Sequence, residues 1–373
     1  EDARELAEVF QGKRPGYNYG RQLNPTVTAL QNKISAMEDG LASAAFATGM
    51  GAISSTILSL LKQGDHIVSS AYLFGNTNSF FGTIQNLGIE VSFVDATDVE
   101  NVAAAIKDNT RLVFVETIAN PVTQIADLLP IGQLCREKGV IYCVDNTMTS
   151  PHLFTPKSVG ASLVVNSLTK YIGGHGNALG GAITDTGLFD WEQFPNISDS
   201  YKGQDPSLWG ITQIKKKGLR DMGASLGPEA AHHLAVGSET LSLRMEKACR
   251  NAKAITEFCD KHSKVKNVYY PGLSSHPQHK RAAELFRGFG ALFSIDLIDE
   301  LDCFDFLNKL DSVVSSSNLG DTRTLAIPVA HTIYYEMGAE RRASMGIADS
   351  MIRFSAGIED VEDLLADFEK ALG

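Results

Sequence analysis

The sequence contains few cysteines, and their placement does not predict a metal site. Five cysteines occur among the 373 residues, at positions 135, 143, 249, 259 and 303. Their number is odd and no two of them have the close pairing of a zinc site. We therefore expect reduced, mostly buried thiols, a reducing compartment and a cytoplasmic location. The sequence has no apolar run of about 20 residues, as a membrane span requires, and no visible signal peptide.

Positive charge is also scarce. The chain has 33 lysines and arginines against 44 acidic residues, a formal net charge of −11. Nucleic-acid binding requires a basic surface, so we expect no nucleic-acid partner, although a locally positive site for a small anion is compatible with this charge. The sequence has no repeats, and its 43% hydrophobic and 21% charged residues are typical of globular proteins.

Histidine and glycine patterns do not indicate a metal or dinucleotide site. His276 and His279 are three residues apart and His232 adjoins His233, but neither pair has an acidic or cysteine partner at zinc spacing. The run Gly173-Gly174-His175-Gly176 lacks the acidic residue of a dinucleotide fingerprint. We expect no metal ligand and assign these residues to the surface or to packing.

Apolar runs alternate with helical patterns through most of the chain. Helices are predicted at 52–62, 77–87, 99–107 and 131–138, and strands at 44–47, 66–69, 91–94, 112–116, 141–145, 163–166 and 181–184. Such alternation is typical of an α/β fold, with a mostly parallel sheet covered on both faces.

Changes in composition and in predicted secondary structure along the chain indicate an N-terminal arm and two domains. Two domains are also expected for a chain of this length. Residues 1–25 are polar and turn-rich, and Thr26 is the expected cap of a helix over 27–37. After residue 227 the pattern becomes one long helical stretch, 229–262, followed by strands at 268–270, 292–296 and 351–355 and helices at 301–310 and 361–371. We predict an arm at 1–25, a large domain at 26–227 and a smaller α+β domain at 228–373.

Lys170 is the most informative residue. It follows an apolar run, Ser167 and Thr169 precede it, and glycines follow it. Taken alone, this run most often marks a surface lysine after a strand. Asp145 changes that balance because it ends another apolar run, and polar residues at the carboxyl ends of parallel strands share one edge of the sheet.

An aspartate and a lysine in this arrangement suit pyridoxal 5'-phosphate (PLP). A buried lysine can form a Schiff base with the aldehyde carbon, and the carboxylate can keep the ring nitrogen protonated. A nearby opposite charge shifts a pKa by about 1–3 units, which is enough to maintain that cationic form.

Further clusters fit such a site. The turn Thr48-Gly49-Met50-Gly51 leads into a helix whose N-terminus could bind phosphate, although such turns commonly need glycine for other reasons. Ser167 and Thr169 could donate hydroxyls to the same phosphate, or face solvent. Asn120 could hydrogen-bond the ring hydroxyl. Arg353 lies in an apolar strand and needs an anionic partner, either a substrate carboxylate or, more commonly, an internal salt bridge.

The residues of these clusters and their order along the chain resemble those of the Cys/Met-metabolism group of fold type I PLP enzymes. This group includes cystathionine γ-synthase, cystathionine lyases, methionine γ-lyase and the O-acyl-homoserine sulfhydrylases. The resemblance extends from about residue 17 to the C-terminus. It depends on motifs at 19–21, 24–26, 48–53, 116–121, 144–147, 167–171 and 352–360.

The resemblance implies a role for each matching residue. Lys170 would be the Schiff-base lysine and the proton-transferring base, and Asp145 would pair with the pyridine nitrogen. Arg353 and Asn318 would bind the substrate carboxylate. The remaining cofactor contacts would come from Gly49, Met50, Ser167 and Thr169 at the phosphate, Phe74 and Asn120 at the ring, and Tyr19 and Arg21 reaching from the arm of a neighbouring subunit. The resemblance further implies a seven-stranded sheet in the large domain and a homotetramer built from dimers.

Three positions depart from the pattern of the family. Phe74 stands where relatives often have a tyrosine over the ring, so stacking is preserved but no phenol is available as an acid. Asn76 replaces the cysteine typical of methionine γ-lyases. Both changes favour a carboxylate leaving group, which needs little protonation. His331 stands where relatives tend to have serine, and is predicted either to contact the sulfur donor or acyl group or to be structural.

Three hypotheses for the function follow. The favoured one is γ-replacement on O-acetylhomoserine or O-succinylhomoserine with a sulfide-level donor, giving homocysteine in methionine biosynthesis. The second is a lyase or cystathionine γ-synthase activity of the same family. The third, a non-catalytic protein that retains the PLP fold, is disfavoured because Lys170, Asp145 and the phosphate-binding residues are all present. The expected partners are small-molecule substrates, with no nucleic acid and no membrane.

Overall fold

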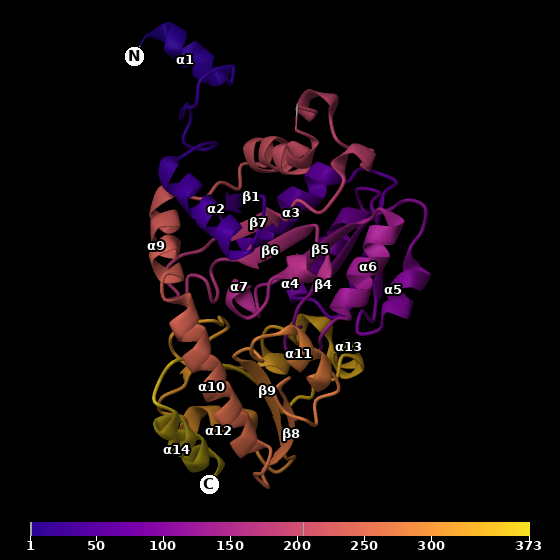
Figure 1. Ribbon diagram of the computed structural model, residues 1–373. Coiled ribbons are helices and arrows are strands. Elements are labelled where there is room, and N and C mark those ends of the chain that lie inside the picture. The colour runs from indigo at the N-terminus through magenta and orange to yellow at the C-terminus, as the bar shows by residue number, and fades with distance from the viewer. Residues whose placement is uncertain (1, 204) are drawn as a thin grey trace.

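A seven-stranded sheet forms the centre of the larger part of the molecule (Figure 1), in a computed structural model that describes residues 2–203 and 205–373. The strand order is β1-β7-β6-β5-β4-β2-β3. The strands are β1 (Ala42–Phe46), β2 (His66–Ser70), β3 (Glu90–Val94), β4 (Thr110–Glu116), β5 (Ile141–Asp145), β6 (Leu163–Ser167) and β7 (Gly181–Asp185). β7 runs antiparallel to both of its neighbours, β1 and β6, and the other neighbouring pairs are parallel. The predicted seven strands and mostly parallel sheet are confirmed.

Both faces of this sheet are buried, as predicted for a parallel sheet. Along β5, Ile141 and Cys143 pack into one hydrophobic cluster while Tyr142 and Val144 pack into another. The helices that contribute to these layers are α2 (Pro25–Met37), α3 (Gly49–Leu60), α4 (Gly75–Gln85), α5 (Val99–Ala105), α6 (Leu128–Lys138), α7 (Ser150–Leu153) and α8 (Trp209–Gln213).

The first helix of the sheet layer begins earlier than the sequence predicted. Asn24, and not Thr26, is its N-cap, because the Asn24 side chain accepts hydrogen bonds from the backbone N–H groups of Thr26 and Val27. Pro25 occupies the first helical position, where its missing N–H costs nothing. In the arm, a helix that the sequence did not predict, α1 (Ala3–Phe10), has no buried residue and stands away from the rest of the chain (Figure 1).

A second sheet of five strands lies beside the first. Its order is β10-β11-β12-β9-β8, and its strands are β8 (Val265–Tyr269), β9 (Leu292–Leu297), β10 (Val314–Ser315), β11 (Leu325–Pro328) and β12 (Met351–Ser355). Its helices are α11 (His279–Leu285), α12 (Cys303–Lys309), α13 (Ala339–Ser344) and α14 (Val361–Leu372). The α/β fold with a smaller C-terminal sheet is therefore as expected.

The single helical stretch predicted for 229–262 is wrong. It consists of two helices, α9 (Pro228–Ser238) and α10 (Leu241–Cys259). Ser238 and Thr240 donate side-chain hydrogen bonds to the carbonyls of Ala235 and Gly237, and such local bonds compete with helix continuation. Helix α9 packs on α2 beside the large sheet. The domain boundary near residue 227 stays a prediction.

The segment between β7 and α9 was the least predictable part. It contains short 3₁₀ helices at Trp191–Gln193, Asp199–Tyr201 and Pro206–Leu208, then α8 and a π-helix, Ile214–Asp221. The π-helix packs against α3. Among the described residues, no helix combines the length and apolar character that a membrane span needs.

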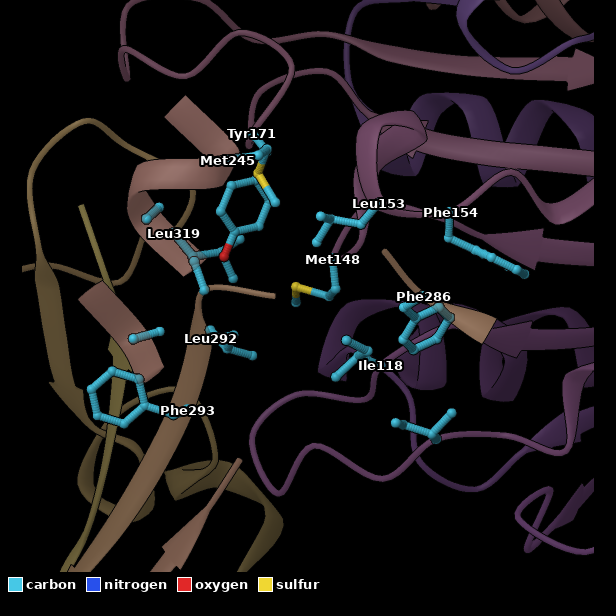
Figure 2. Close-up of a cluster of buried hydrophobic side chains, with 14 of the residues drawn as sticks. Ile118, Met148, Leu153, Phe154, Tyr171, Met245, Phe286, Leu292, Phe293 and Leu319 are labelled. Carbon is cyan, nitrogen blue, oxygen red and sulfur yellow. The ribbon is translucent and has the colours of Figure 1, made fainter. Parts of the chain in front are cut away.

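The two parts share hydrophobic contacts (Figure 2). Ile118 and Met148, from the loops that follow β4 and β5, belong to the same buried cluster as Leu292 of β9 and Leu319. The loops at the carboxyl edge of the large sheet are thereby held against the second sheet. This contact fixes the walls of the cavity described next.

Candidate active site

A cavity of about 340 Å³ opens at the carboxyl edge of the large sheet. An outer cavity of about 650 Å³ adjoins it, and both are lined by Phe74, Thr169 and Lys170. The inner cavity is also lined by Gly49, Met50, Glu116, Asn120, Asp145, Ser167 and Arg353. Nearly every site residue predicted from the sequence therefore meets here. No group of histidine, cysteine and acidic side chains that could hold a metal ion occurs among the described residues.

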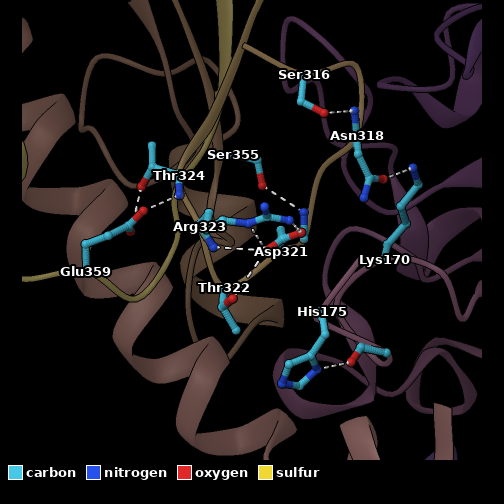
Figure 3. Close-up of polar contacts among 12 residues, drawn as sticks. Lys170, His175, Ser316, Asn318, Asp321, Thr322, Arg323, Thr324, Ser355 and Glu359 are labelled. Atoms are coloured by element: carbon cyan, nitrogen blue, oxygen red, sulfur yellow. Dashed lines mark hydrogen bonds and ion pairs between the residues drawn. The ribbon is translucent and has the colours of Figure 1, made fainter. Parts of the chain in front are cut away.

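Lys170 lies in the turn after β6 and faces the second sheet. Its Nζ donates a hydrogen bond to Oδ1 of Asn318 over 2.6 Å (Figure 3). Burial, and to a smaller extent the nearby positive charge of Arg353, lowers the pKa of Lys170 from 10.5 to about 8. About a tenth of the amine is therefore uncharged at pH 7, far more than for an ordinary lysine, and nucleophilic attack on an aldehyde requires this uncharged form.

Two carboxyl groups stand side by side at the ends of β4 and β5, where Glu116 is in register with Asp145. Asp145 accepts a hydrogen bond from the backbone N–H of Thr147 over 2.9 Å. Glu116 accepts one from the backbone N–H of Phe74 over 2.7 Å. Burial raises the pKa of Asp145 to about 6, and burial together with Asp145 raises that of Glu116. A cation bound beside Asp145 would favour the charged form of its carboxyl group and so lower its pKa again.

The N-terminus of α3 forms a concave corner with β6. Thr48 caps the helix by accepting a hydrogen bond from the N–H of Gly51 over 2.8 Å. A side chain at Gly49 would come within 3.0 Å of Cβ of Ser167, so the backbone approaches β6 closely only because this residue is glycine. Free N–H groups at a helix start, together with the Ser167 hydroxyl, suit an anion such as phosphate.

Thr169 and Met50 are each held by one neighbour. The Thr169 hydroxyl donates to the carbonyl of Gly180 over 3.2 Å and accepts from its N–H over 3.1 Å. Met50 packs under the cavity, with its sulfur 3.7 Å from the Thr77 hydroxyl. A hydrogen bond from the Thr169 hydroxyl to a phosphate would replace the one to the Gly180 carbonyl, because the hydroxyl has a single proton to donate.

Arg353 on β12 is 1% exposed and lines the inner cavity. Its Nη2 donates to the carbonyls of Ser317 and Asn318 over 3.2 and 2.8 Å, while Nε has no partner among the residues that the structure describes. Burial lowers its pKa to about 10. In the part of the chain that the structure describes, no carboxylate lies within ion-pair distance, so an internal salt bridge does not explain this arginine.

Asn120 also carries a buried group, its Oδ1, that has no partner in the described part of the chain. The phenol of Tyr334 donates to the backbone carbonyl of Asn120 over 2.6 Å. Tyr334 lines the outer cavity and was missed in the sequence, as were Leu179, Ser317 and Ile333. These residues lie in loops, where only the adjacent aromatics at 334 and 335 were a detectable signal.

Some candidates lie outside the cavity. Tyr19 is 52% exposed, and Arg21 lies over its ring at 5.2 Å and donates to the carbonyl of Arg220. Neither lines the cavity of its own chain. His331 bonds the Asp349 carbonyl over 3.0 Å and lies beside the ring of Phe304, away from the cavity. Both predictions for His331, a contact with the sulfur donor or acyl group and a structural role, stay predictions.

The arrangement fits PLP. The unpaired Nε of Arg353 and Oδ1 of Asn120 are buried polar groups that a ligand would satisfy, as such groups normally are. The glycine corner beside Ser167 leaves room for a phosphate. A lysine with a lowered pKa and a buried aspartate face the same inner cavity.

Comparisons with known proteins agree with this geometry. The family model described as "Cys/Met metabolism PLP-dependent enzyme" matches residues 2–373. A solved structure of a putative O-acetylhomoserine (thiol)-lyase from Campylobacter jejuni, which contains N'-pyridoxyl-lysine-5'-monophosphate, superposes with a TM-score of 0.94. It is 30% identical, and the match covers 100% of this chain and 92% of that one.

Two relatives with different named activities are similarly close. L-methionine gamma-lyase from Fusobacterium nucleatum subsp. polymorphum is 40% identical over 97% of this chain and 88% of the relative. O-acetyl-L-homoserine sulfhydrylase 1 from Thermus thermophilus is 39% identical over 98% of this chain and 90% of the relative. Overall identity therefore does not discriminate between a lyase and a sulfhydrylase.

Proposed function

Because the chain belongs to the Cys/Met metabolism family of PLP-dependent enzymes, we propose that it replaces the acyl group of O-acetylhomoserine or O-succinylhomoserine with sulfur. The product is homocysteine, a precursor in methionine biosynthesis. In the net reaction the Cγ–O bond breaks, the acylate leaves with the electron pair, and hydrosulfide forms the Cγ–S bond. No net oxidation or proton change is required.

The cofactor residues in this proposal are those at the sheet edge. PLP, when bound, supplies an electron sink for carbanion chemistry at the substrate. Lys170 would hold the aldehyde carbon of the cofactor, and the same amine would move protons at the Cα and Cβ atoms of the substrate. Asp145 keeps the pyridine nitrogen protonated. Gly49, Met50, Ser167 and Thr169 hold the phosphate, Asn120 the ring hydroxyl, and Phe74 stacks on the ring.

Substrate binding is assigned to the opposite wall. The Nη2 of Arg353 donates to two backbone carbonyls, while its buried Nε–H has no partner among the described residues. Arg353 can therefore bind the amino-acid carboxylate. Asn318 joins the two halves of the site, since its Oδ1 bonds Lys170 and its carbonyl bonds Arg353. Its side chain is therefore placed to contact the substrate next to the proton-transferring amine.

Phe74 is the observation that carries the choice of reaction. It lines both cavities, yet its ring offers no acidic proton. Tyr334 also borders the outer cavity, but its phenol is bonded to Asn120 and burial raises its pKa, which makes it a weaker acid. An acylate leaves without protonation more easily than a thiolate, because it is the weaker base. The site therefore favours acyl-homoserine substrates.

A methionine γ-lyase activity is the second candidate. It is favoured by the 40% identity to a protein of that name. Steady-state rates separate the two: the purified holoenzyme is assayed with O-acetylhomoserine plus sulfide, with O-succinylhomoserine plus sulfide, and with methionine alone. Homocysteine formation should exceed the release of 2-oxobutanoate from methionine. Faster release from methionine would overturn the proposal.

The arm supports an assembly in which neighbouring subunits share sites. Tyr19 and Arg21 do not line their own cavity, and α1 buries none of its residues. We assign both side chains to the phosphate of a neighbouring subunit in a homotetramer built from dimers. Sedimentation measurements of the full chain and of Arg21→Ala check the assembly, and PLP titration of the same proteins checks the phosphate contact.

A further inference from the structure

A buried carboxyl group lies behind the cofactor face of the sheet, outside both cavities. Glu38 follows the last turn of α2 and is 0% exposed. Its Oε1 accepts hydrogen bonds from the side-chain amides of Asn146 over 2.9 Å and Asn166 over 2.6 Å. Its other oxygen, Oε2, has no partner among the described residues.

The two asparagines are direct chain neighbours of proposed cofactor residues. Asn146 follows Asp145 at the end of β5, and Asn166 precedes Ser167 at the end of β6. These strands are adjacent and parallel. Because side chains alternate along a strand, Asn166 and Ser167 point to opposite faces of the sheet. Glu38 thus bonds the back of the strand whose front holds the proposed phosphate contact.

The network extends to a third strand end. The Asn146 Oδ1 accepts a hydrogen bond from the Thr149 hydroxyl, which in turn lies 3.0 Å from the hydroxyl of Thr117. Thr117 directly follows Glu116, at the end of β4. One chain of buried polar contacts therefore joins the ends of β4, β5 and β6.

Anchoring α2 to the sheet does not by itself account for a carboxyl group at this position. Apolar residues of α2, such as Leu30 and Ile34, already bury that helix against the sheet layer. Burial disfavours the charged form of Glu38 and raises its pKa to about 7. A carboxyl group at this position is therefore costly to bury. Buried polar groups of this kind are retained where their hydrogen bonds fix one arrangement.

We propose that Glu38 is a positioning residue for the cofactor: through Asn146 and Asn166 it sets the spacing between Asp145, which anchors the ring, and Ser167, which binds the phosphate. This inference rests on the cofactor roles in the proposed function. It does not depend on which substrate the enzyme uses, because its test reads cofactor binding and not turnover.

The test compares Glu38→Ala, Glu38→Gln and Glu38→Asp with the parent. Full-length apoprotein is titrated with PLP, and the wavelength and pH midpoint of the visible band of the cofactor are recorded for each holoprotein. Glu38→Ala is expected to weaken PLP binding by about 10- to 100-fold and to shift the band midpoint, as is typical when a group that orients direct ligands is lost. Glu38→Gln keeps an oxygen acceptor and should retain most of the affinity.

Asp185→Ala is the matched control. Asp185 is another fully buried carboxyl of the same sheet, bonded to Trp191 Nε1 and the N–H of Gly187, each over 2.9 Å. It lies at the end of β7 that pairs with Leu163, away from Ser167. Its loss should lower the melting temperature while leaving PLP affinity and the visible band unchanged.

Two results would overturn the proposal. One is an unchanged PLP affinity and band midpoint in Glu38→Ala. The other is an equal loss of affinity in Asp185→Ala, which would make the effect a general loss of stability. If Glu38→Ala does not fold, the comparison of Glu38→Asp with Glu38→Gln decides. Glu38→Asp is one methylene too short to reach both amides and must bind PLP more weakly than Glu38→Gln, and equal affinities contradict the positioning role.

Discussion

The two walls of the active-site cavity are built in different ways. The wall on the large-sheet side is built around strand ends, where Glu116, Asp145 and Ser167 are the last residues of β4, β5 and β6. The start of α3 and the turn that carries Lys170 adjoin these strand ends. The facing wall comes from the second part of the chain, where loops supply Ser317, Asn318, Ile333 and Tyr334, and only Arg353 is on a strand.

The difference separates two tasks. Strand ends are held by ladder hydrogen bonds on both sides and by the network behind them, so the groups assigned to the cofactor have little freedom. Loop residues are joined by fewer contacts, and loops commonly carry specificity in enzymes of one fold. We therefore expect substitutions in the wall of strand ends (the sheet wall) to change how the cofactor is bound and activated. Substitutions in the facing wall of loops (the loop wall) should change the choice of substrate.

The largest effect is expected at the sheet wall. Asp145→Asn removes the charge that holds the ring nitrogen protonated, and a charge of this kind shifts a pKa by about 1–3 units. We expect kcat to fall by about 10- to 1000-fold, while PLP remains bound through Lys170 and the phosphate pocket. Turnover and the visible absorbance of the same sample measure both. A kcat close to that of the parent would contradict the assigned role.

Arg353→Lys tests the facing wall. A lysine cannot reproduce the planar guanidinium contacts, and hydrogen bonds to charged groups contribute about 1.5–3 kcal/mol. The KM for O-acetylhomoserine should rise by about 10- to 100-fold, with kcat and PLP binding changed much less. Arg281→Lys is the control, because Arg281 pairs with Asp127 outside the cavity and should leave KM unchanged. Weakened PLP binding in Arg353→Lys would contradict the assignment of cofactor and substrate to different walls.

The lowered pKa of Lys170 gives a pH dependence of cofactor uptake. Below its pKa of about 8 the amine is mostly protonated, and above that value it is mostly free to attack the aldehyde. The rate of PLP incorporation by the apoprotein should therefore rise about tenfold per pH unit up to about pH 8 and then level off. A rate that keeps rising towards the ordinary lysine pKa of 10.5 would show that burial does not act on this amine.

The smallest effect is expected for Phe74→Tyr. The added phenol supplies an acid above the ring and should raise elimination from methionine, relative to replacement on O-acetylhomoserine, by about two- to tenfold, below the roughly 100-fold or more of a fully positioned acid. Phe304→Tyr is a matched control, since Phe304 is 43% exposed compared with 40% for Phe74 and lies outside the cavity. An unchanged ratio in Phe74→Tyr would remove the argument for an acylate leaving group.

The sequence predicted the sheet wall well and the loop wall poorly. Asp145, Ser167 and Lys170 each follow an apolar run that reads as a buried strand, and the carboxyl ends of parallel strands meet at one edge. Arg353 was detectable because a charge inside an apolar strand is unusual. Ile333 and Tyr334 had no such signal, since the path of a loop depends on contacts with residues distant in the sequence.

Helix boundaries failed for local reasons. The helical spacing of apolar residues continues from Leu234 to Leu241, but α9 ends at Ser238, where Ser238 and Thr240 donate side-chain bonds to the backbone. Asn24-Pro25 reads equally well as a turn and as a helix start, and the structure uses it as a cap. The network of Glu38 was not predictable, because its members come from four separate segments that only the folded sheet brings together.

Reduction of the holoenzyme with borohydride, followed by proteolysis and mass spectrometry, tests the central assignment most directly. Hydride fixes the cofactor on the nitrogen that carries it. A pyridoxyl group on the peptide containing Lys170, and its absence from that peptide in Lys170→Ala, is the result expected from an amine with a lowered pKa in the cavity shared with Asp145. A label on another lysine, with Lys170 unmodified, would contradict the account.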